Sequence, residues 1–230
     1  YKRDIMKYKR DDSSQKLYID EVFQLIPSEL NAKNKRFILK SLNEKARFAS
    51  CENSFLWLRD AGVALPTYNV EEPKLPLLLA KTRNLFKLFQ SDVGLLTSQF
   101  ADGIQLKLLG DNQAINYGAI YENVVAQELK AHGFDLYYYN SKRLGELDFV
   151  VEYHGNVLPI EVKSGKDYER HNALSNVMSS AEYALSEALV LCNGNVSVDG
   201  KVVYMPIYML MFLEKEQVVN VTYKLDLSDL

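Results

Sequence analysis

Two segments of the chain alternate between apolar and ionisable residues, and this alternation constrains the fold more than any other feature of the sequence. They are Glu146–Val151, which reads Glu-Leu-Asp-Phe-Val-Val, and Val157–Lys163, which reads Val-Leu-Pro-Ile-Glu-Val-Lys. Successive side chains of a β-strand point to opposite faces of the sheet. Each segment therefore predicts a strand with one apolar face, made of Leu147, Phe149 and Val151 in the first strand and of Leu158, Ile160 and Val162 in the second.

The turn between these strands decides whether their ionisable faces coincide. We predict a two-residue loop at Gly155-Asn156, in which glycine supplies the positive φ of a type II′ turn. This register pairs Asp148 with Lys163 and Val150 with Glu161, so that two carboxylates and one ammonium share a face. A three-residue loop would separate the two faces unless a bulge restored the register.

A fourth ionisable group comes from the preceding segment, Gln113–His132, which predicts a long helix closed by Gly133. Glu122 lies at the centre of its apolar stripe, which consists of Ile115, Gly118, Ala119, Val125, Ala126 and Leu129. An uncompensated buried carboxylate is costly. Glu122 is therefore expected to have a partner, either a cation or a metal ion.

These groups together predict one divalent-metal site. Glu122, Asp148 and Glu161 are the expected ligands of Mg²⁺ or Mn²⁺, since both ions prefer carboxylate oxygens. Such an ion can activate water and stabilise the charge that develops in phosphodiester cleavage. Asp148, Glu161 and Lys163 are the expected catalytic residues, and Lys163 would orient water or neutralise the reacting phosphate. The alternative is a surface salt bridge between Asp148 and Lys163, which leaves Glu122 unexplained.

Several further residues flank this predicted site. Four of them are cations, Lys142, Arg143, Lys166 and Arg170. These side chains either contact phosphate groups or are ordinary surface charges. His171 is a candidate beside them. Tyr137–Tyr139 could stack bases, but aromatic residues on a central strand are more often part of the core.

The N-terminal part, residues 1–100, predicts a winged helix that is mainly α-helical. Its expected helices and strands are Gln15–Ile26, Lys33–Leu42, Cys51–Ala61, Val63–Val70 and Asn84–Phe89. We expect its basic side chains either to contact DNA or to form a solvated face. These residues are Lys33, Lys35, Arg36, Lys40, Lys45 and Arg47. Phe55 and Trp57 are expected to pack against the second domain.

Residues 101–230 predict an α/β domain with a mixed central sheet. After the helix at Gln113–His132, its expected elements are strands at Phe134–Tyr139, Glu146–Tyr153 and Val157–Lys163, a helix at Arg170–Leu185, strands at Ala188–Cys192 and Val202–Met205, and a helix at Pro206–Glu214.

Composition narrows the class of protein. Hydrophobic residues make up 47% of the chain and the net charge is −3, which is typical of a soluble, cytoplasmic globular protein and excludes a polycation. The longest apolar run, Val202–Leu213, is interrupted by Pro206 and is shorter than the roughly 20 residues of a membrane span. Cys51 and Cys192 are expected to be buried thiols. The start at Tyr1 suggests a chain cut from a longer polypeptide.

The set Glu122, Asp148 and Glu161-Val162-Lys163 resembles the PD-(D/E)xK nuclease superfamily of restriction endonucleases and Holliday-junction resolvases. Longer runs resemble the C-terminal region of prokaryotic AAA+ family ATPases, at Arg3–Ile5, Phe55–Gly62, Phe86–Leu96 and Tyr121–Asn123. In that group a P-loop ATPase is followed by a winged helix and then by a domain of unknown function with a nuclease-like fold. This chain has no Gly-x-x-x-x-Gly-Lys-Ser/Thr motif, so no nucleotide is expected to bind it in that way.

Three functions follow as hypotheses. The first is a metal-dependent nuclease domain that acts on DNA and works with an upstream ATPase domain of the same polypeptide. The second is a catalytically silent module that binds DNA or protein and regulates the ATPase, and the third is a winged-helix transcription factor. Metal binding separates the first from the other two, while a homo-oligomer is compatible with each.

Overall fold

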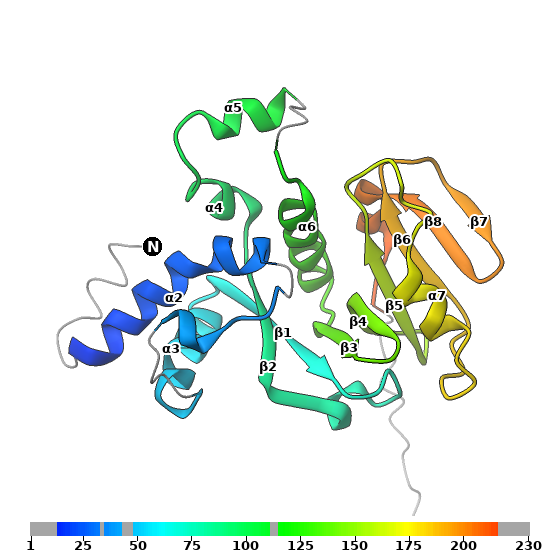
Figure 1. The fold of residues 1–230 in the computed structure, drawn as a ribbon, viewed down its shortest axis with the longest axis horizontal. Helices are drawn as coiled ribbons and strands as arrows, with labels where there is room; N and C mark the ends of the chain where they lie inside the picture. The colour runs from blue at the N-terminus through cyan, green and yellow to red at the C-terminus, as the bar shows by residue number, and fades with distance from the viewer. Residues whose placement is uncertain (1–12, 33–34, 43–47, 111–114, 216–230) are drawn as a thin grey trace, which may run out of the picture.

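In the described part of the chain, the strands form one mixed eight-stranded sheet, in the order β2-β1-β3-β4-β5-β6-β8-β7 (Figure 1). The computed structural model describes residues 13–32, 35–42, 48–110 and 115–215. The α/β class with a mixed sheet and a helical N-terminal part is therefore confirmed. Helices lie on both faces of the sheet, as the side chains of two buried clusters show.

The N-terminal helices differ from the prediction in their bounds. They are α2 (Ser13–Asn31), the 3-10 turn η2 (Leu39–Ser41) and α3 (Phe48–Asp60). Helix α2 continues through Pro27, because its buried apolar stripe, which includes Phe23 and Leu30, extends past the proline. The second predicted helix, Lys33–Leu42, is reduced to η2 in its described part, and residues 33–34 lie outside the described residues.

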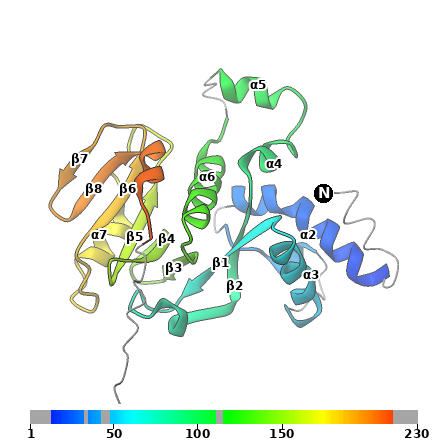
Figure 2. The same cartoon turned by 180° about the vertical axis from the view of Figure 1, so that it is seen from behind.

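The predicted wing is instead one edge of the sheet. Strands β1 (Ala64–Val70) and β2 (Lys81–Gln90) form an antiparallel pair, and η3 (Leu77–Ala80) lies between them. Strand β1 also pairs in parallel with β3 (Tyr137–Ser141), where Tyr68 lies opposite Tyr137. The segments 1–100 and 101–230 thus share one sheet. Figure 2 shows α2 and α3 beside β1 and β2 from behind.

Phe55 on α3 is buried between Phe37 and Phe86, and Trp57 is partly buried against the same core. Both aromatic side chains therefore join the core, but the ring contacts of Phe55 lie within residues 1–100, so their packing against the second domain stays a prediction. The core that they join also contains side chains of α6 and of the central strands, so it extends across both halves of the sequence.

Two short helices that the sequence did not predict follow β2, namely α4 (Val93–Thr97) and α5 (Ile104–Leu109). Asp92 caps α4 by accepting hydrogen bonds from the backbone N–H groups of Gly94 and Leu95, at 2.6 and 3.1 Å. Helix α6 (Gly118–Ala131) lies inside the predicted Gln113–His132, of which residues 113–114 are outside the described part.

The remaining elements follow the predicted order with shorter helices. They are β4 (Gly145–Tyr153), β5 (Asn156–Val162), α7 (Asn172–Met178), β6 (Ala188–Cys192), β7 (Ser197–Asp199), β8 (Val202–Pro206) and the 3-10 helix η4 (Ile207–Phe212). The helix expected at Arg170–Leu185 ends at Met178, and strand β7 was not predicted. Cys51 and Cys192 are buried thiols, as expected.

The hairpin between β4 and β5 turns one residue earlier than predicted. Tyr153 pairs with Asn156, so the loop is His154-Gly155, and both residues have positive φ, at 46° and 69°. This is the pattern of a type I′ turn. The register differs from the predicted one by two residues, so the paired side chains of the two strands still point to the same face of the sheet. Phe149 lies opposite Ile160, and extending the ladder by one pair brings Asp148 opposite Glu161.

A β-bulge in β4 corrects one further prediction. Tyr137 pairs with Val150 but Tyr139 pairs with Leu147, so Asp148 and Phe149 together oppose the single residue Tyr138. Leu147 consequently joins the core beneath α7, whereas Phe149 joins the core beneath α6. The sequence had placed Leu147 and Phe149 on one face. Because of the bulge, simple alternation no longer fixes the direction of the Asp148 side chain.

One buried amide fastens α6 to the sheet edge. The side chain of Asn123 accepts a hydrogen bond from the backbone N–H of Gln90 at 2.8 Å and donates one to the carbonyl of Gln90 at 3.0 Å. Asn123 is fully buried. The clamp therefore joins the helix that carries Glu122 to strand β2.

We predict that Asn123→Ala destabilises the protein, because each buried backbone group left unpaired costs about 1–3 kcal/mol. Urea unfolding followed by circular dichroism measures this loss. Lys130→Ala, an exposed position of the same helix, is the control and should change the free energy of unfolding by less than about 0.5 kcal/mol. If Asn123→Ala behaves like the control, α6 is held by apolar packing alone.

Candidate functional site

The first part of the candidate site lies where β4 and β5 run side by side. An Asp148 carboxylate oxygen, Oδ2, accepts a hydrogen bond of 2.9 Å from the backbone N–H of Val162. The Lys163 ammonium donates to Oε1 of Glu161 at 2.8 Å. Asp148 and Glu161 are both buried, while Lys163 is partly exposed. The structure therefore brings the three predicted catalytic residues together at the end of β5.

The second part is Glu122 on α6, which is only 2% exposed. Its Oε1 oxygen forms an ion pair with the ammonium of Lys35, which also lies 4.0 Å from Oδ1 of Asp148. Lys35 stands between α2 and η2, with a backbone φ of 47°. The partner required by Glu122 is thus a cation of the N-terminal part. Lys35 had been expected on a DNA-binding or solvated surface instead.

A second lysine of the N-terminal part also reaches this region. The side chain of Lys87 on β2 is 0% exposed, and its ammonium lies 2.7 Å from Oε1 of Glu146 and over the ring of Tyr138. Sequence reasoning did not identify Lys87. The signal was a single ionisable residue inside the apolar run Phe86-Lys87-Leu88-Phe89, which requires a buried counter-charge.

Burial and mutual repulsion shift the acidities of the carboxyl groups. Burial, followed by the charge of Asp148, raises the pKa of Glu122 to about 7, against the opposing effects of Lys87 and Lys35. Burial and Asp148 likewise raise the pKa of Glu161 to about 8, although Lys163 opposes them. Both groups therefore gain or lose a proton near neutral pH.

The lysines shift in the direction that keeps them charged. Burial by itself would lower the pKa of Lys35, but Glu122 and Asp148 outweigh it and raise the pKa. Burial would also lower the pKa of Lys87, but the negative charges of Glu122 and then Glu146 outweigh it and raise the pKa. The cluster therefore consists of charged lysines and of carboxyl groups whose ionisation depends on each other.

Two carboxylate oxygens in this cluster fit a further cation. Oε2 of Glu122 and Oε2 of Glu161 are buried, and neither has a hydrogen-bond partner within the described part of the chain. A buried oxygen without a partner is costly, and a cation would satisfy it. Mg²⁺ commonly takes only one or two protein carboxylates and completes its shell with water and phosphate. Asp148 and Glu161 are suitable for that role.

The predicted three-carboxylate arrangement is nevertheless not assembled. Among the described residues, no three His, Cys, Asp or Glu side chains lie close enough together to hold one metal ion. The physical reason is visible at Glu122, because its Oε1 oxygen is already held by Lys35. As the side chains stand, Glu122 is an ion-pair partner and is not grouped with Asp148 and Glu161 as a ligand.

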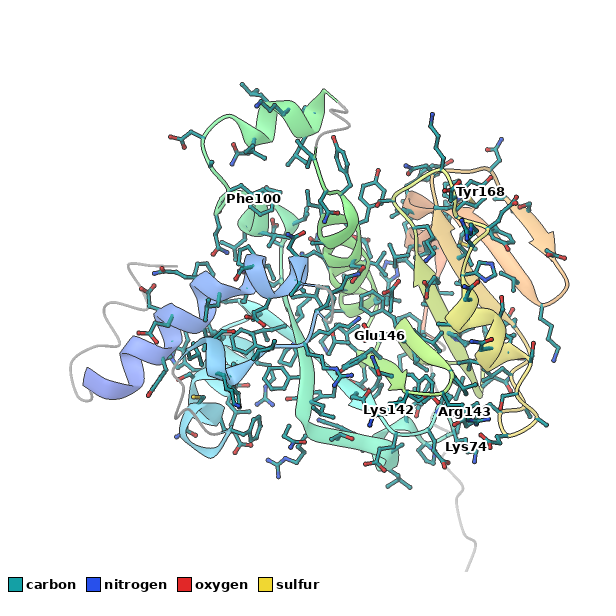
Figure 3. All side chains as sticks on the ribbon, in the orientation of Figure 1. Lys74, Phe100, Lys142, Arg143, Glu146 and Tyr168 are labelled. Carbon is teal, nitrogen blue, oxygen red and sulfur yellow. The ribbon has the colours of Figure 1, made fainter. Side chains whose placement is uncertain are left out.

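The four flanking cations do not line one surface. Lys142 and Arg143 lie in the turn between β3 and β4, near Lys74, and Figure 3 shows them well away from Tyr168. Arg143 forms an ion pair with Glu182 at 2.5 Å. Lys166 and Arg170 belong instead to the exposed loop that contains Tyr168. Only this second pair follows the strand that carries Glu161.

His171 belongs to the core beneath α7 and not to the carboxylate cluster. Its Nε2 lies 2.7 Å from the hydroxyl of Tyr204 and its Nδ1 lies 3.2 Å from Oγ of Ser175. Both ring nitrogens therefore have partners in this buried setting, which removes His171 from the candidates. Tyr137–Tyr139 are buried on β3, as expected of core residues.

A cavity of about 730 Å³ opens beside Lys163. It is formed by the residues before α6 and by the loops that follow β5 and β6, and its lining includes Asn116, Tyr117, Ser164, Lys166, Tyr168 and Asn193. Ser164 directly follows Lys163 in the chain. Strands β5 and β6 are parallel and both end here, which is where ligands commonly bind to parallel sheets.

The fold and site define an α/β protein with a buried carboxylate–lysine cluster beside a cavity at the strand ends. Two sequence families match the chain. A domain of unknown function, DUF8612, matches residues 1–106, and another, DUF4143, matches residues 117–210. DUF4143 is a C-terminal domain associated with AAA ATPases. Each match covers less than half of the 230 residues.

Comparison with curated proteins and with solved structures found no match for this chain. Within the part of the chain that the structure describes, none of the helices has both the length and the apolar character that crossing a bilayer requires. The two family matches divide the cluster between them, because Lys35 and Lys87 fall in the first and Glu122, Asp148 and Glu161 in the second.

The raised pKa values of Glu122 and Glu161 predict how stability depends on pH. Glu122 and Glu161 have pKa values of about 7 and about 8 in the folded protein, above the ordinary 4.5. At pH values between 4.5 and these raised pKa values, the folded state holds protons that the unfolded chain has lost. The free energy of unfolding should therefore fall as the pH rises from about 4.5 to about 8.

Urea unfolding at successive pH values in metal-free buffer measures this fall. Glu161→Gln should make the fall smaller, since glutamine does not titrate, whereas Glu169→Gln in the exposed loop should leave it unchanged. A wild-type stability that stays level or increases over this range contradicts the prediction.

Proposed function

We propose that the chain carries a metal-dependent site for phosphodiester hydrolysis, with DNA as its substrate. The observation that carries this proposal is the arrangement at the end of β5. There Asp148 adjoins Glu161, Glu161 is paired with Lys163, and a buried oxygen of Glu161 has no partner among the described residues. Carboxylates and a lysine beside a cavity suit a reaction in which negative charge develops on phosphate.

Asp148 and Glu161 would hold Mg²⁺ or Mn²⁺. When bound, such an ion supplies Lewis-acid stabilisation of the phosphate and a more acidic water molecule. The backbone N–H of Val162 fixes one oxygen of Asp148, so the other faces the cluster. Glu122 is a third ligand only if its ion pair with Lys35 opens.

Lys163 acts on the reacting groups more than on the ion. Its ammonium is partly exposed and holds Glu161, and the next residue along the chain lines the cavity. From this position it can donate hydrogen bonds to a phosphate oxygen or orient the attacking water. Lys166 in the following loop is placed to hold an adjacent phosphate.

The resemblance to PD-(D/E)xK nucleases supports the same proposal. A helical Glu122 is followed by Asp148 on one strand and Glu161-Val162-Lys163 at the end of the next, and all of them lie within the DUF4143 match. Together with the association of that domain with ATPases, this supports a chain that forms the C-terminal part of an AAA+ family ATPase. Its upstream ATPase domain and DNA are then the expected partners.

A silent regulatory module is the second candidate function. Lys35 favours it, since an internal ammonium already neutralises Glu122 and no three-carboxylate group is assembled within the described residues. A protein that keeps this fold for contact with an ATPase or with DNA would need no metal ion. The intact protein, tested with its ATPase domain and ATP, would then bind DNA without cutting it.

Replacing Lys163 by Ala should reduce Mg²⁺-dependent nicking of plasmid and branched DNA by about 100-fold or more, because the lysine acts on water and transition state. Metal binding should not be lost, since an ammonium is no ligand. Asp148→Ala and Glu161→Ala should lose both metal binding and cleavage.

The assay follows nicking on gels in Mg²⁺ or Mn²⁺, with Mn²⁺ affinity from calorimetry. Lys107→Ala, an exposed lysine on α5, is the matched control and should cut like the wild type. Cleavage that survives in Asp148→Ala and Glu161→Ala would reject this site as the source of activity.

A further inference from the structure

We propose that Lys35 is the resident cation at Glu122 and sets how tightly a divalent ion binds, by competing with that ion for Glu122. Lys35 is then a positioning residue, since it acts on the site through Glu122. This inference rests on the proposed metal-dependent function and adds a role for the N-terminal part of the chain.

The contacts of Lys35 place its charge between two candidate ligands. Its ammonium pairs with Oε1 of Glu122 and lies 4.0 Å from Oδ1 of Asp148, so one cation serves carboxylates from α6 and from β4. A metal ion that bridges Glu122 and Asp148 would bring a second positive charge to the same two carboxylates. The two cations therefore compete at Glu122.

The balance of charge leads to the same conclusion. Among the described residues, four carboxylates gather here, Glu122, Glu146, Asp148 and Glu161, and their ion pairs involve three lysines, Lys35, Lys87 and Lys163. The fully ionised cluster therefore carries a charge of −1. Adding a divalent ion while every lysine stays would reverse the sign, and release of one ammonium restores neutrality. Burying excess charge is costly, which favours exchange over simple addition.

Exposure excludes Lys87 as the lysine that leaves, and position separates the other two. The side chain of Lys87 is 0% exposed and cannot reach water unless the core opens, whereas the side chain of Lys35 is 26% exposed. Lys163 is also partly exposed, but it pairs with Glu161 at the other end of the cluster. Lys35 can therefore turn into solvent while the fold around Glu122 stays closed.

The test compares Mn²⁺ affinity, measured by calorimetry in metal-free buffer, among the wild type, Lys35→Met and Lys35→Arg. Removing the ammonium should tighten Mn²⁺ binding by about tenfold or more, because the ion no longer displaces a cation. Arginine keeps the charge and should restore the weaker wild-type affinity. Lys40→Met, an exposed lysine on η2, is the matched control and should bind like the wild type.

A second measurement uses the unmodified protein, in case Lys35→Met fails to fold. Acetylation of lysines by an activated ester, read by mass spectrometry, should label Lys35 faster when saturating Mn²⁺ is present, because its ammonium is then released from Glu122. Labelling of Lys40 should not change. Labelling of Lys35 that Mn²⁺ leaves unchanged or slows would overturn the inference.

The outcomes separate this inference from the proposed function. If the wild type and Lys35→Met bind Mn²⁺ equally and both cut DNA, Lys35 is no competitor, and the metal-dependent function stands. If Lys35→Arg tightens binding as much as Lys35→Met does, charge is not the cause and the inference fails. If no variant binds Mn²⁺, the inference and the metal-dependent function fail together.

Discussion

Mutual neutralisation of buried charges is the constraint on which the rest of this structure depends. Lys87 and Glu122 lie almost entirely out of water, and either one alone would strongly oppose folding. The fold removes that cost by bringing β2, α6 and β4 together, so that Lys87 contacts Glu146 and Lys35 contacts Glu122. The sheet order, with β1 and β3 between β2 and β4, and the clamp of Asn123 on Gln90 hold those elements at the required distance.

The same constraint relates the cluster to chemistry. A set of carboxylates surrounded only by apolar groups would remain protonated, while lysines placed beside them keep part of the set ionised near neutral pH. Ionised oxygens are the form that binds a metal ion. Stability and the proposed metal-assisted hydrolysis would thus depend on one charge balance. Residues within both family matches contribute to that balance.

Much of the site could be predicted from local sequence, because a register error of two residues leaves each side chain on the same face of the sheet. The hairpin loop was placed one residue too late, and the register moved by two, so Phe149 and Ile160 still share a core. The bulge at Asp148 was not predictable from alternation, nor was the shared sheet, since β1 pairs with β3 across a long sequence separation. Lys35 and Glu122 are 87 residues apart, and no local pattern joins them.

The parallel pairing of β1 with β3 also determines how this chain can be divided. A fragment that begins near residue 117, at the start of the DUF4143 match, would lose β1 and leave one side of β3 without a neighbour. That strand carries Tyr137, Tyr138 and Tyr139, so its open edge would present unpaired backbone groups on an aromatic, strongly β-forming segment. Such an edge is a template for pairing between copies, and the isolated fragment is expected to aggregate.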